Sequence, residues 1–267
     1  MKKVICTIAA IASLFALVGC KKVEKSSGDG VAALKERGVF VLGLDDSFPP
    51  MGFRSEENEI VGYDIDLGRE VAKRLGVEFK AQPIDWAAKE MELETGKIDC
   101  IWNGFSRNPE RIEALSFTEP YLNNEQVLVV RKADNIKSLA DMAGKKIGIQ
   151  SGSSAQDAVE SKPEFANSLA EIVKYKENIT ALNDLDIGGI DGVVMDSVVA
   201  SYAIAKANKP FELMPEALAT EAYGIAFRKN EPELRDAAWA ALQEMAADGT
   251  VEAISNKWFG KNISVIK

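Results

Sequence analysis

The sequence alternates between strand-like and helix-like segments, and this alternation starts twice. In the first half, strands are expected at 39–44, 77–81 and 98–102, and helices at 65–75 and 86–93. From about Leu139 the pattern restarts in KKIGIQSGSSAQDAVE and DGVVMDSVVASYAIAKA. A strand follows in YGIAFRK, and residues 231–259 are predicted to be largely helical. Strands alternating with helices predict mostly parallel sheets covered on both faces, here in two α/β lobes.

The helix over 65–75 has the clearest predicted boundaries. Apolar residues recur along one face of it, and Gly76 follows as a terminator. Asp64 precedes it and is a candidate N-cap, because a short polar side chain there accepts a hydrogen bond from the first turn. We therefore expect the chain to enter this helix at Asp64.

Polar loops follow three of the predicted strands, in WNGFSRNPER, QSGSS and MDSVV. In open α/β sheets, ligands gather outside the carboxyl ends of the strands. Asn108 can cap a helix that has Pro109 at its first position, beside Arg111. Residues 151–154 offer a second helix start with free backbone N–H groups. Two helix starts suited to anions, one on each lobe, predict a cleft for a ligand that carries a carboxylate.

Histidine is absent from all 267 residues. Zinc sites and nucleophilic triads built on histidine are therefore excluded, and we assign no catalytic residue, metal or cofactor. The 41 acidic and 32 basic residues give a net charge of −9, which argues against a nucleic-acid partner. With 46% hydrophobic residues, the chain can bury a large core.

The first twenty residues read as an export signal rather than as part of the fold. Two lysines precede an apolar run that is shorter than the roughly 20 residues of a membrane-spanning helix. The stretch LVGC resembles the lipobox of bacterial lipoproteins, in which Cys20 would be lipidated. Residues 21–30 then form a polar tether. Cys100 is the one cysteine of the body and is expected to be a buried small side chain.

Residues 62–75, GYDIDLGREVAKRL, resemble the signature of the bacterial solute-binding proteins of polar amino-acid ABC transporters, solute-binding protein family 3, here of the lipoprotein type. The resemblance continues through LDDSFPPMGF, GKIDC, WNGFSRNPER, FTEPYL, SLADMAGKKIGIQSGSS, IDGVVMD, YGIAF and KWFG. It covers nearly all of the chain after the tether. It implies an α/β, two-lobed periplasmic-binding-protein-like fold of type II, with a hinge and a ligand cleft between the lobes.

The same resemblance implies a division of the chain and a function. The parts would be a signal peptide at 1–20, a tether at 21–30, lobe 1 at 31–120 and 224–267, lobe 2 at 126–218, and hinge strands at 121–125 and 219–223. The lobes would close over a polar L-amino acid, either cationic or like glutamine or cystine, for delivery to a membrane permease and its ATPase. A monomer held outside the cytoplasm by a lipid anchor, in a periplasm or on a cell surface, is expected.

One end of the implied site binds the ligand's α-carboxylate. Arg111 matches the family's carboxylate-binding arginine, and a guanidinium fork suits that role because it pairs bidentately and keeps its proton. Ser153 and Ser154 match positions whose N–H groups meet the carboxylate. Outside the resemblance, Arg111 would read as a solvated helix residue and the serines as turn formers.

The opposite end of the implied site receives the α-ammonium group. Asp196 matches the family's carboxylate at this point, although as the residue before a helix it would also serve as an N-cap. Gly104 and Ser106 match positions that supply a carbonyl and a hydroxyl. They would equally suit an ordinary turn.

The ligand's side chain is implied to lie between Phe48 and Trp86, two aromatic residues that would otherwise be core residues. Asp45 matches a carboxylate at the far end of the side chain, and its alternative is a solvated turn. Asn103 and Gln150 depart from the family's usual residues at their positions. Each adds an amide with two donors and an acceptor, which suits several polar side chains.

A second interpretation belongs to a different class of protein. The same fold includes cyclohexadienyl dehydratases, which act on arogenate or prephenate with a cleft glutamate as general acid. Glu90 is the candidate for that acid, because it would lie one helical turn from Trp86 if Trp86 faces the cleft. The ammonium carboxylate at Asp196 and the lipid anchor favour transport.

Overall fold

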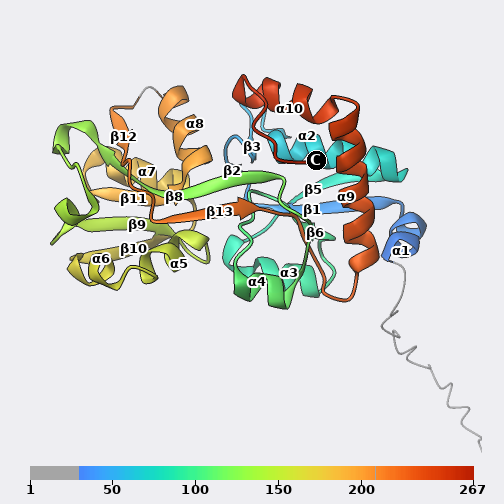
Figure 1. Cartoon of the computed structure of the whole chain (residues 1–267), viewed down its shortest axis with the longest axis horizontal. Helices are drawn as coiled ribbons and strands as arrows, with labels where there is room; N and C mark the ends of the chain where they lie inside the picture. The colour runs from blue at the N-terminus through green and yellow to red at the C-terminus, as the bar shows by residue number, and fades with distance from the viewer. Residues whose placement is uncertain (1–29, 208) are drawn as a thin grey trace, which may run out of the picture.

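The computed structural model describes residues 30–207 and 209–267, and these form two α/β lobes (Figure 1). The predicted signal, Cys20 and the tether up to residue 29 lie outside the described residues. Gly30, expected to end the tether, begins the first helix, α1 (Gly30–Arg37). The two-lobed α/β fold is as predicted.

The first lobe is built on a five-stranded sheet. Its order is β5 (Glu78–Pro83), β1 (Val39–Leu44), β6 (Cys100–Ile101), β14 (Ala226–Phe227) and β7 (Ser116–Phe117). Strand β1 runs parallel to β5 and β6, whereas β14 is antiparallel to its neighbours. Around this sheet lie α2 (Tyr63–Leu75), α3 (Lys89–Glu94), α4 (Pro109–Ala114), α9 (Pro232–Ala247) and α10 (Thr250–Phe259). A small hairpin sheet adds β2 (Ser47–Phe48), β3 (Gly52–Arg54) and β4 (Ile60–Val61).

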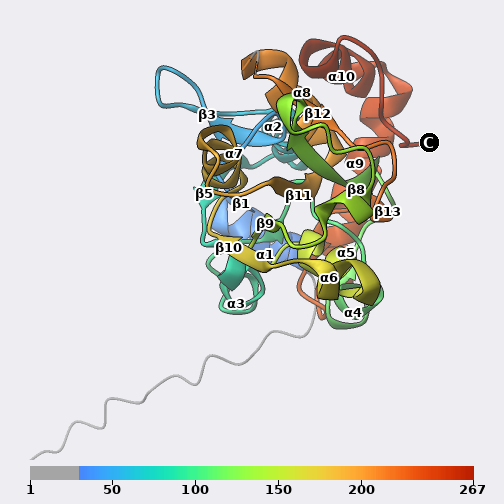
Figure 2. The ribbon, with the colours of Figure 1, turned by 90° about the vertical axis from the view of Figure 1, so that its left-hand side faces the viewer.

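The second lobe is built on a six-stranded sheet. Its order is β10 (Glu171–Tyr175), β9 (Lys146–Gln150), β11 (Gly192–Asp196), β8 (Leu122–Arg131) and β12 (Phe211–Leu213), and β13 (Ala219–Tyr223) also pairs with β8. Its helices are α5 (Ser154–Glu160), α6 (Pro163–Ser168), α7 (Asn178–Ile187) and α8 (Ser197–Ala207). Figure 2 shows this sheet between α5 and α6 on one side and α7 and α8 on the other.

Alternate residues of the second sheet enter different core clusters. Val193 and Met195 pack with residues of α7 and α8, whereas Val194 packs with residues of α5 and α6. Because successive side chains of a strand point to opposite faces, both faces must be apolar. This explains why GVVMD carries no polar alternation before its final aspartate.

The sheets differ from the prediction in direction and length. They are mixed rather than mostly parallel, because β8 runs against both β11 and β13, and β14 runs against β6. The segments 98–102 and 223–229 supply only two-residue strands, β6 and β14. Strands β8 and β13 pair with each other, from Leu122 opposite Tyr223 to Gln126 opposite Ala219. Both run between the lobes (Figure 1).

The predicted role of Asp64 as an N-cap is wrong. Helix α2 begins at Tyr63 after Gly62, so Asp64 lies inside its first turn and is fully buried. Its Oδ2 atom accepts hydrogen bonds from the backbone N–H of Gly104 at 2.8 Å and from the hydroxyl of Tyr121 at 3.0 Å. Asp64 therefore fixes the loop after β6. Gly76 ends the helix in the left-handed conformation, as predicted.

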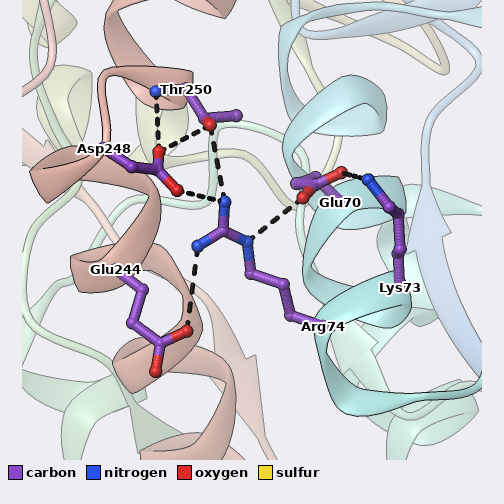
Figure 3. A network of polar contacts seen from close by, with 6 residues as sticks. All are labelled: Glu70, Lys73, Arg74, Glu244, Asp248 and Thr250. Carbon is purple, nitrogen blue, oxygen red and sulfur yellow. Dashed lines mark hydrogen bonds and ion pairs between the residues drawn. The ribbon is translucent and has the colours of Figure 1, made fainter.

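The C-terminal helices are attached to α2 by a polar network (Figure 3). The guanidinium of Arg74 contacts Glu70 at 3.1 Å, Glu244 at 3.7 Å and Asp248 at 2.6 Å. Asp248 in turn accepts from the backbone N–H and hydroxyl of Thr250. The end of the chain is thereby held on the first lobe, far in sequence from the residues it contacts.

We expect buried Asp64 to make a contribution to stability that is lost as the pH rises from about 4 to 7. Burial raises the pKa of Asp64 from 3.8 to about 7. Over this interval the folded state holds a proton that the unfolded state has released, so the free energy of unfolding falls with rising pH. The change from Asp64 is on the order of a few kcal/mol.

Replacing Asp64→Asn should reduce this decline, because the amide keeps an acceptor for Gly104 and carries no charge. Urea unfolding, followed by tryptophan fluorescence at several pH values, measures this decline in the free energy of unfolding. Asp66→Asn is the matched control, since Asp66 lies partly exposed in the same helical turn. An equal decline in Asp64→Asn and the unaltered protein would contradict the account.

Candidate functional site

All eleven predicted ligand-binding residues line one pocket. The pocket lies between the lobes, since its lining comes from loops and helix starts of both sheets. Phe105 lines it as well and was not predicted. From the first lobe come Asp45, Phe48, Trp86, Asn103, Gly104, Ser106 and Arg111, and from the second Gln150, Ser153, Ser154 and Asp196.

The cap that positions Arg111 is as predicted. Asn108 accepts a hydrogen bond from the backbone N–H of Arg111 at 2.8 Å, and Pro109 occupies the first position of α4. The guanidinium donates to the carbonyls of Ser106 at 3.1 Å and Gly152 at 3.3 Å. It also lies over the ring of Phe105, 4.6 Å from its centroid.

These contacts of Arg111 are all with neutral groups. Burial lowers its pKa from the usual value, yet a guanidinium remains protonated in proteins. Among the residues that the structure describes, no carboxylate lies within ion-pairing distance of Arg111. A desolvated cation that faces carbonyls and a ring favours an anion as its missing partner.

A second cation of this region, Lys89, was not predicted. Its side chain is only 3% exposed, and its ammonium donates to the carbonyls of Trp86 at 3.2 Å and of Gly152 at 2.9 Å. The Gly152 carbonyl thus joins the second lobe to two cations of the first. With φ of +71°, a Cβ atom at Gly152 would come within 3.2 Å of Ala87 Cα.

Asp196 lines the pocket from the second lobe. It is the last residue of β11, and its Oδ1 accepts from Asn124 Nδ2 at 2.7 Å, Gln126 Nε2 at 3.0 Å and Tyr223 OH at 2.7 Å. Burial, and secondly the charge of Glu221, raise the pKa of Asp196 to about 7. Its environment therefore favours a neutral acid or a cationic partner.

Glu221 was not among the predicted site residues, although 219–223 was expected to be a hinge strand. It lies on β13, and its carboxylate accepts hydrogen bonds from the hydroxyls of Ser106 and Ser154, one from each lobe. Only the pairing of β8 and β13 brings this residue beside Asp196. No local pattern in the sequence indicates it.

Asp45 and Gln150 meet across the lobes at the side-chain end of the pocket. Asp45 accepts from Ser47 and, through Oδ2, from Gln150 Nε2 at 2.7 Å. Gln150 in turn accepts from Asn178 Nδ2 at 2.9 Å. Asn103 accepts from the backbone N–H of Asp45 at 3.0 Å, and its buried Nδ2 has no hydrogen-bond partner. This part of the pocket offers a carboxylate, together with amide groups that can donate and accept hydrogen bonds.

Aromatic rings form the apolar walls. Phe48 is 5% exposed and Trp86 8%, and Trp86 meets Phe105 edge to face with 5.6 Å between ring centroids. Gly104 has φ of +58°, and a Cβ atom there would lie 3.1 Å from the rings of Phe48 and Tyr223. Glycine is therefore required where the loop passes between these rings.

Glu90 lies outside this pocket. It lines a neighbouring hollow with Asp157 and Gln156, and its carboxylate pairs with Lys89 at 3.2 Å. An acid for the dehydratase reaction would have to reach a ligand in the pocket itself. The position of Glu90 does not suit that role.

Residues 30–207 and 209–267 contain no helix long and apolar enough to cross a membrane.

The chain is similar to several named amino-acid-binding proteins. The chain is 29% identical over 252 residues to the L-cystine-binding protein TcyJ of Escherichia coli K12, covering 93% of each. It is 32% identical over 224 residues to ABC transporter arginine-binding protein 1 of the same organism, covering 82% of this chain and 89% of the relative.

A crystal structure of an ABC uptake transporter substrate-binding protein from Streptococcus pneumoniae with bound histidine is also similar. Its TM-score is 0.87 at 37% identity, over 90% of this chain and 100% of that one. The sequence profile of the bacterial extracellular solute-binding proteins, family 3, matches residues 40–261. The chain belongs to the bacterial extracellular solute-binding proteins of family 3.

Proposed function

We propose that the protein is the extracytoplasmic binding component of an ABC uptake transporter and captures a polar L-amino acid between its lobes. The observation that carries this proposal is the charge pattern of the pocket. Arg111, which pairs with no carboxylate among the described residues, lines the same pocket as Asp196, whose environment favours a cation. A zwitterionic amino acid supplies the anion and the cation that these two groups lack.

The side-chain end supports a polar rather than an apolar ligand. Asp45 would accept from an amine, guanidinium or amide, and the free Nδ2 donor of Asn103 would suit a ligand acceptor. The similar proteins are named for cystine or arginine, or have histidine bound, and each of these amino acids carries polar groups in its side chain. A ligand with a glutamine-like side-chain amide fits the same hydrogen-bonding groups of Asp45 and Asn103.

Contacts between the lobes support capture by closure. Gln150 bonds Asp45, Lys89 bonds the Gly152 carbonyl, and Asn108 Nδ2 donates to Asp157 at 3.0 Å. Lobe 1 would comprise 31–120 and 224–267 and lobe 2 126–218, turning on 121–125 and 219–223. Closure excludes water and strengthens the charged contacts inside.

We further propose that Cys20 carries a lipid that anchors the protein outside the cytoplasm. Residues 21–30 would then be a tether that leaves the lobes free to meet the permease. The apolar run, the lipobox-like LVGC and the polar segment after it support this arrangement. Metabolic labelling with a fatty acid, lost in Cys20→Ala, would test it.

Arg111→Ala should abolish detectable binding of amino acids, raising Kd by about a hundredfold or more, because the buried carboxylate loses its charged partner. Calorimetric titration with L-cystine, L-arginine and L-histidine measures this. The control is Arg69→Ala, which removes another guanidinium that lies over a ring, that of Phe79, away from the pocket. Retained micromolar binding in Arg111→Ala would contradict the carboxylate assignment.

Asp45→Asn should change the ranking of ligands rather than remove binding. The amide keeps an acceptor toward Gln150 or Ser47 but loses the charge that favours a cationic side chain. We expect the affinity for L-arginine to fall by about tenfold relative to that for L-glutamine. Competition among amino acids measures the ranking, and an unchanged order would place Asp45 outside the ligand's reach.

A further inference from the structure

Four hydrogen-bond donors converge on one carboxylate oxygen of Glu221. Its Oε2 accepts from Ser106 Oγ at 2.6 Å and from Ser154 Oγ at 3.1 Å. It also accepts from Gln126 Nε2 at 3.0 Å and Asn124 Nδ2 at 3.2 Å. Ser106 belongs to the loop after β6 and Ser154 begins α5, so a residue on a strand between the lobes (Figure 1) contacts both of them.

These hydrogen bonds decide what the two serines offer to the pocket. A hydroxyl has one proton to donate and two lone pairs to accept with. Ser106 gives its proton to Glu221, and Ser154 donates within the same cluster, to Glu221 or to Ser106 Oγ at 3.1 Å. Ser154 Oγ also accepts from Gln126 Nε2 at 3.1 Å. Each hydroxyl has thus used its proton within the cluster and keeps an acceptor lone pair, which suits the N–H donors of an ammonium.

Glu221 also shares its amide donors with Asp196. Asn124 Nδ2 and Gln126 Nε2 each reach Oδ1 of Asp196 and Oε2 of Glu221. Two carboxylates held by the same donors repel each other, which makes a cation between them favourable.

Two other titratable groups face this pair. Tyr223, from β13, donates its hydroxyl to Asp196, and Arg111, from α4, interacts with both carboxylates through its charge. Neither removes the repulsion, because the tyrosine is neutral and Arg111 forms no ion pair with either carboxylate within the described residues.

We propose that Glu221 is a positioning residue of the amino-acid site. Its carboxylate holds the hydroxyls of the two lobes together as acceptors and, with Asp196, requires an ammonium group in the cleft. The inference rests on the proposed function, because the cation is the α-ammonium of the captured amino acid. Glu221 acts through Ser106, Ser154 and Asp196 rather than by lining the pocket itself.

A dependence on pH follows. Burial and Glu221 raise the pKa of Asp196 to about 7, so below that pH the free protein carries a proton there. The ligand's ammonium must displace this proton, which leaves to the solvent. Affinity should therefore weaken as the pH falls below 7, by up to about tenfold per pH unit. Glu221→Gln removes the neighbouring charge and moves this decline to lower pH.

The test is calorimetric titration of the full chain from pH 5.5 to 8.5 with L-cystine, L-arginine and L-histidine. Titration in two buffers of different ionisation enthalpy counts the protons released on binding. For Glu221→Gln we expect about tenfold weaker binding at pH 8. We also expect fewer protons released at pH 6 to 7 than for the unaltered chain.

Two further variants make the result specific. Glu221→Asp keeps the charge and should retain the proton release, even if it binds more weakly. Glu125→Gln removes an exposed carboxylate from the neighbouring strand β8 and should change neither quantity. Thermal unfolding of each variant checks that it is folded.

The outcomes separate the inference from the function on which it rests. If Glu221→Gln binds less tightly at every pH but releases as many protons as Glu125→Gln, Glu221 is only structural and the inference is overturned. The same holds if Glu221→Asp loses the proton release and Glu221→Gln retains it. If the unaltered chain binds none of the three amino acids, the proposed function fails, whatever Glu221 does.

Discussion

A guanidinium that is partly removed from water needs either an anion or many acceptors, and within the described part of the chain Arg111 contacts carbonyl oxygens and the face of an aromatic ring but pairs with no carboxylate. The rest of the candidate site is arranged around this cation, which lacks an anionic partner. Asn108 caps the short helix that presents Arg111, and buried Asp64 fixes the loop beside it through Gly104. The ligand's carboxylate would complete what the protein leaves open.

The two strands that run between the lobes, β8 and β13, also supply polar side chains around Asp196. Strand β8 supplies Asn124 and Gln126, and β13 supplies Glu221 and Tyr223, to the carboxylate Asp196 on β11. The surroundings of Asp196 are thus assembled from strands that run between the lobes. A change in the pairing of these strands would alter the charge environment of the ligand directly.

The residues that line the pocket were predicted largely through the family resemblance, and the loops after strands indicated the same edge of the sheets. Arg111 follows a recognisable cap and Asp196 ends an apolar strand, so both could be placed at the carboxyl edge of a sheet. Lys89 and Glu221 could not, because their roles arise from contacts between segments 63 and 115 residues away along the chain. Asp64 was placed in the wrong role for the same reason, since a burial partner distant in sequence outweighs a local capping preference.

In the fold, too, features with a local sequence signal were predicted and features set by distant contacts were not. Helix periodicity and glycine terminators located α2, whereas the mixed direction of the sheets depends on returning strands that carry no local mark of their direction. Short strands such as β6 and β14 are set by their neighbours in the sheet rather than by their own pattern. The order of the helices and strands along the chain could therefore be predicted from the sequence, whereas the pairing of the strands could not.

The central claim is that the pocket holds an amino acid by its two charged groups. The most direct test is thermal unfolding of the protein, first denatured and refolded to remove bound ligand, against each proteinogenic amino acid and cystine. A ligand at a hundred times its Kd adds roughly 2.7 kcal/mol, and each kcal/mol raises the melting temperature by about 2 to 4 °C at this size. A rise of several degrees with one or a few polar amino acids is expected. No rise with any of them, in protein that unfolds cooperatively, would contradict the account.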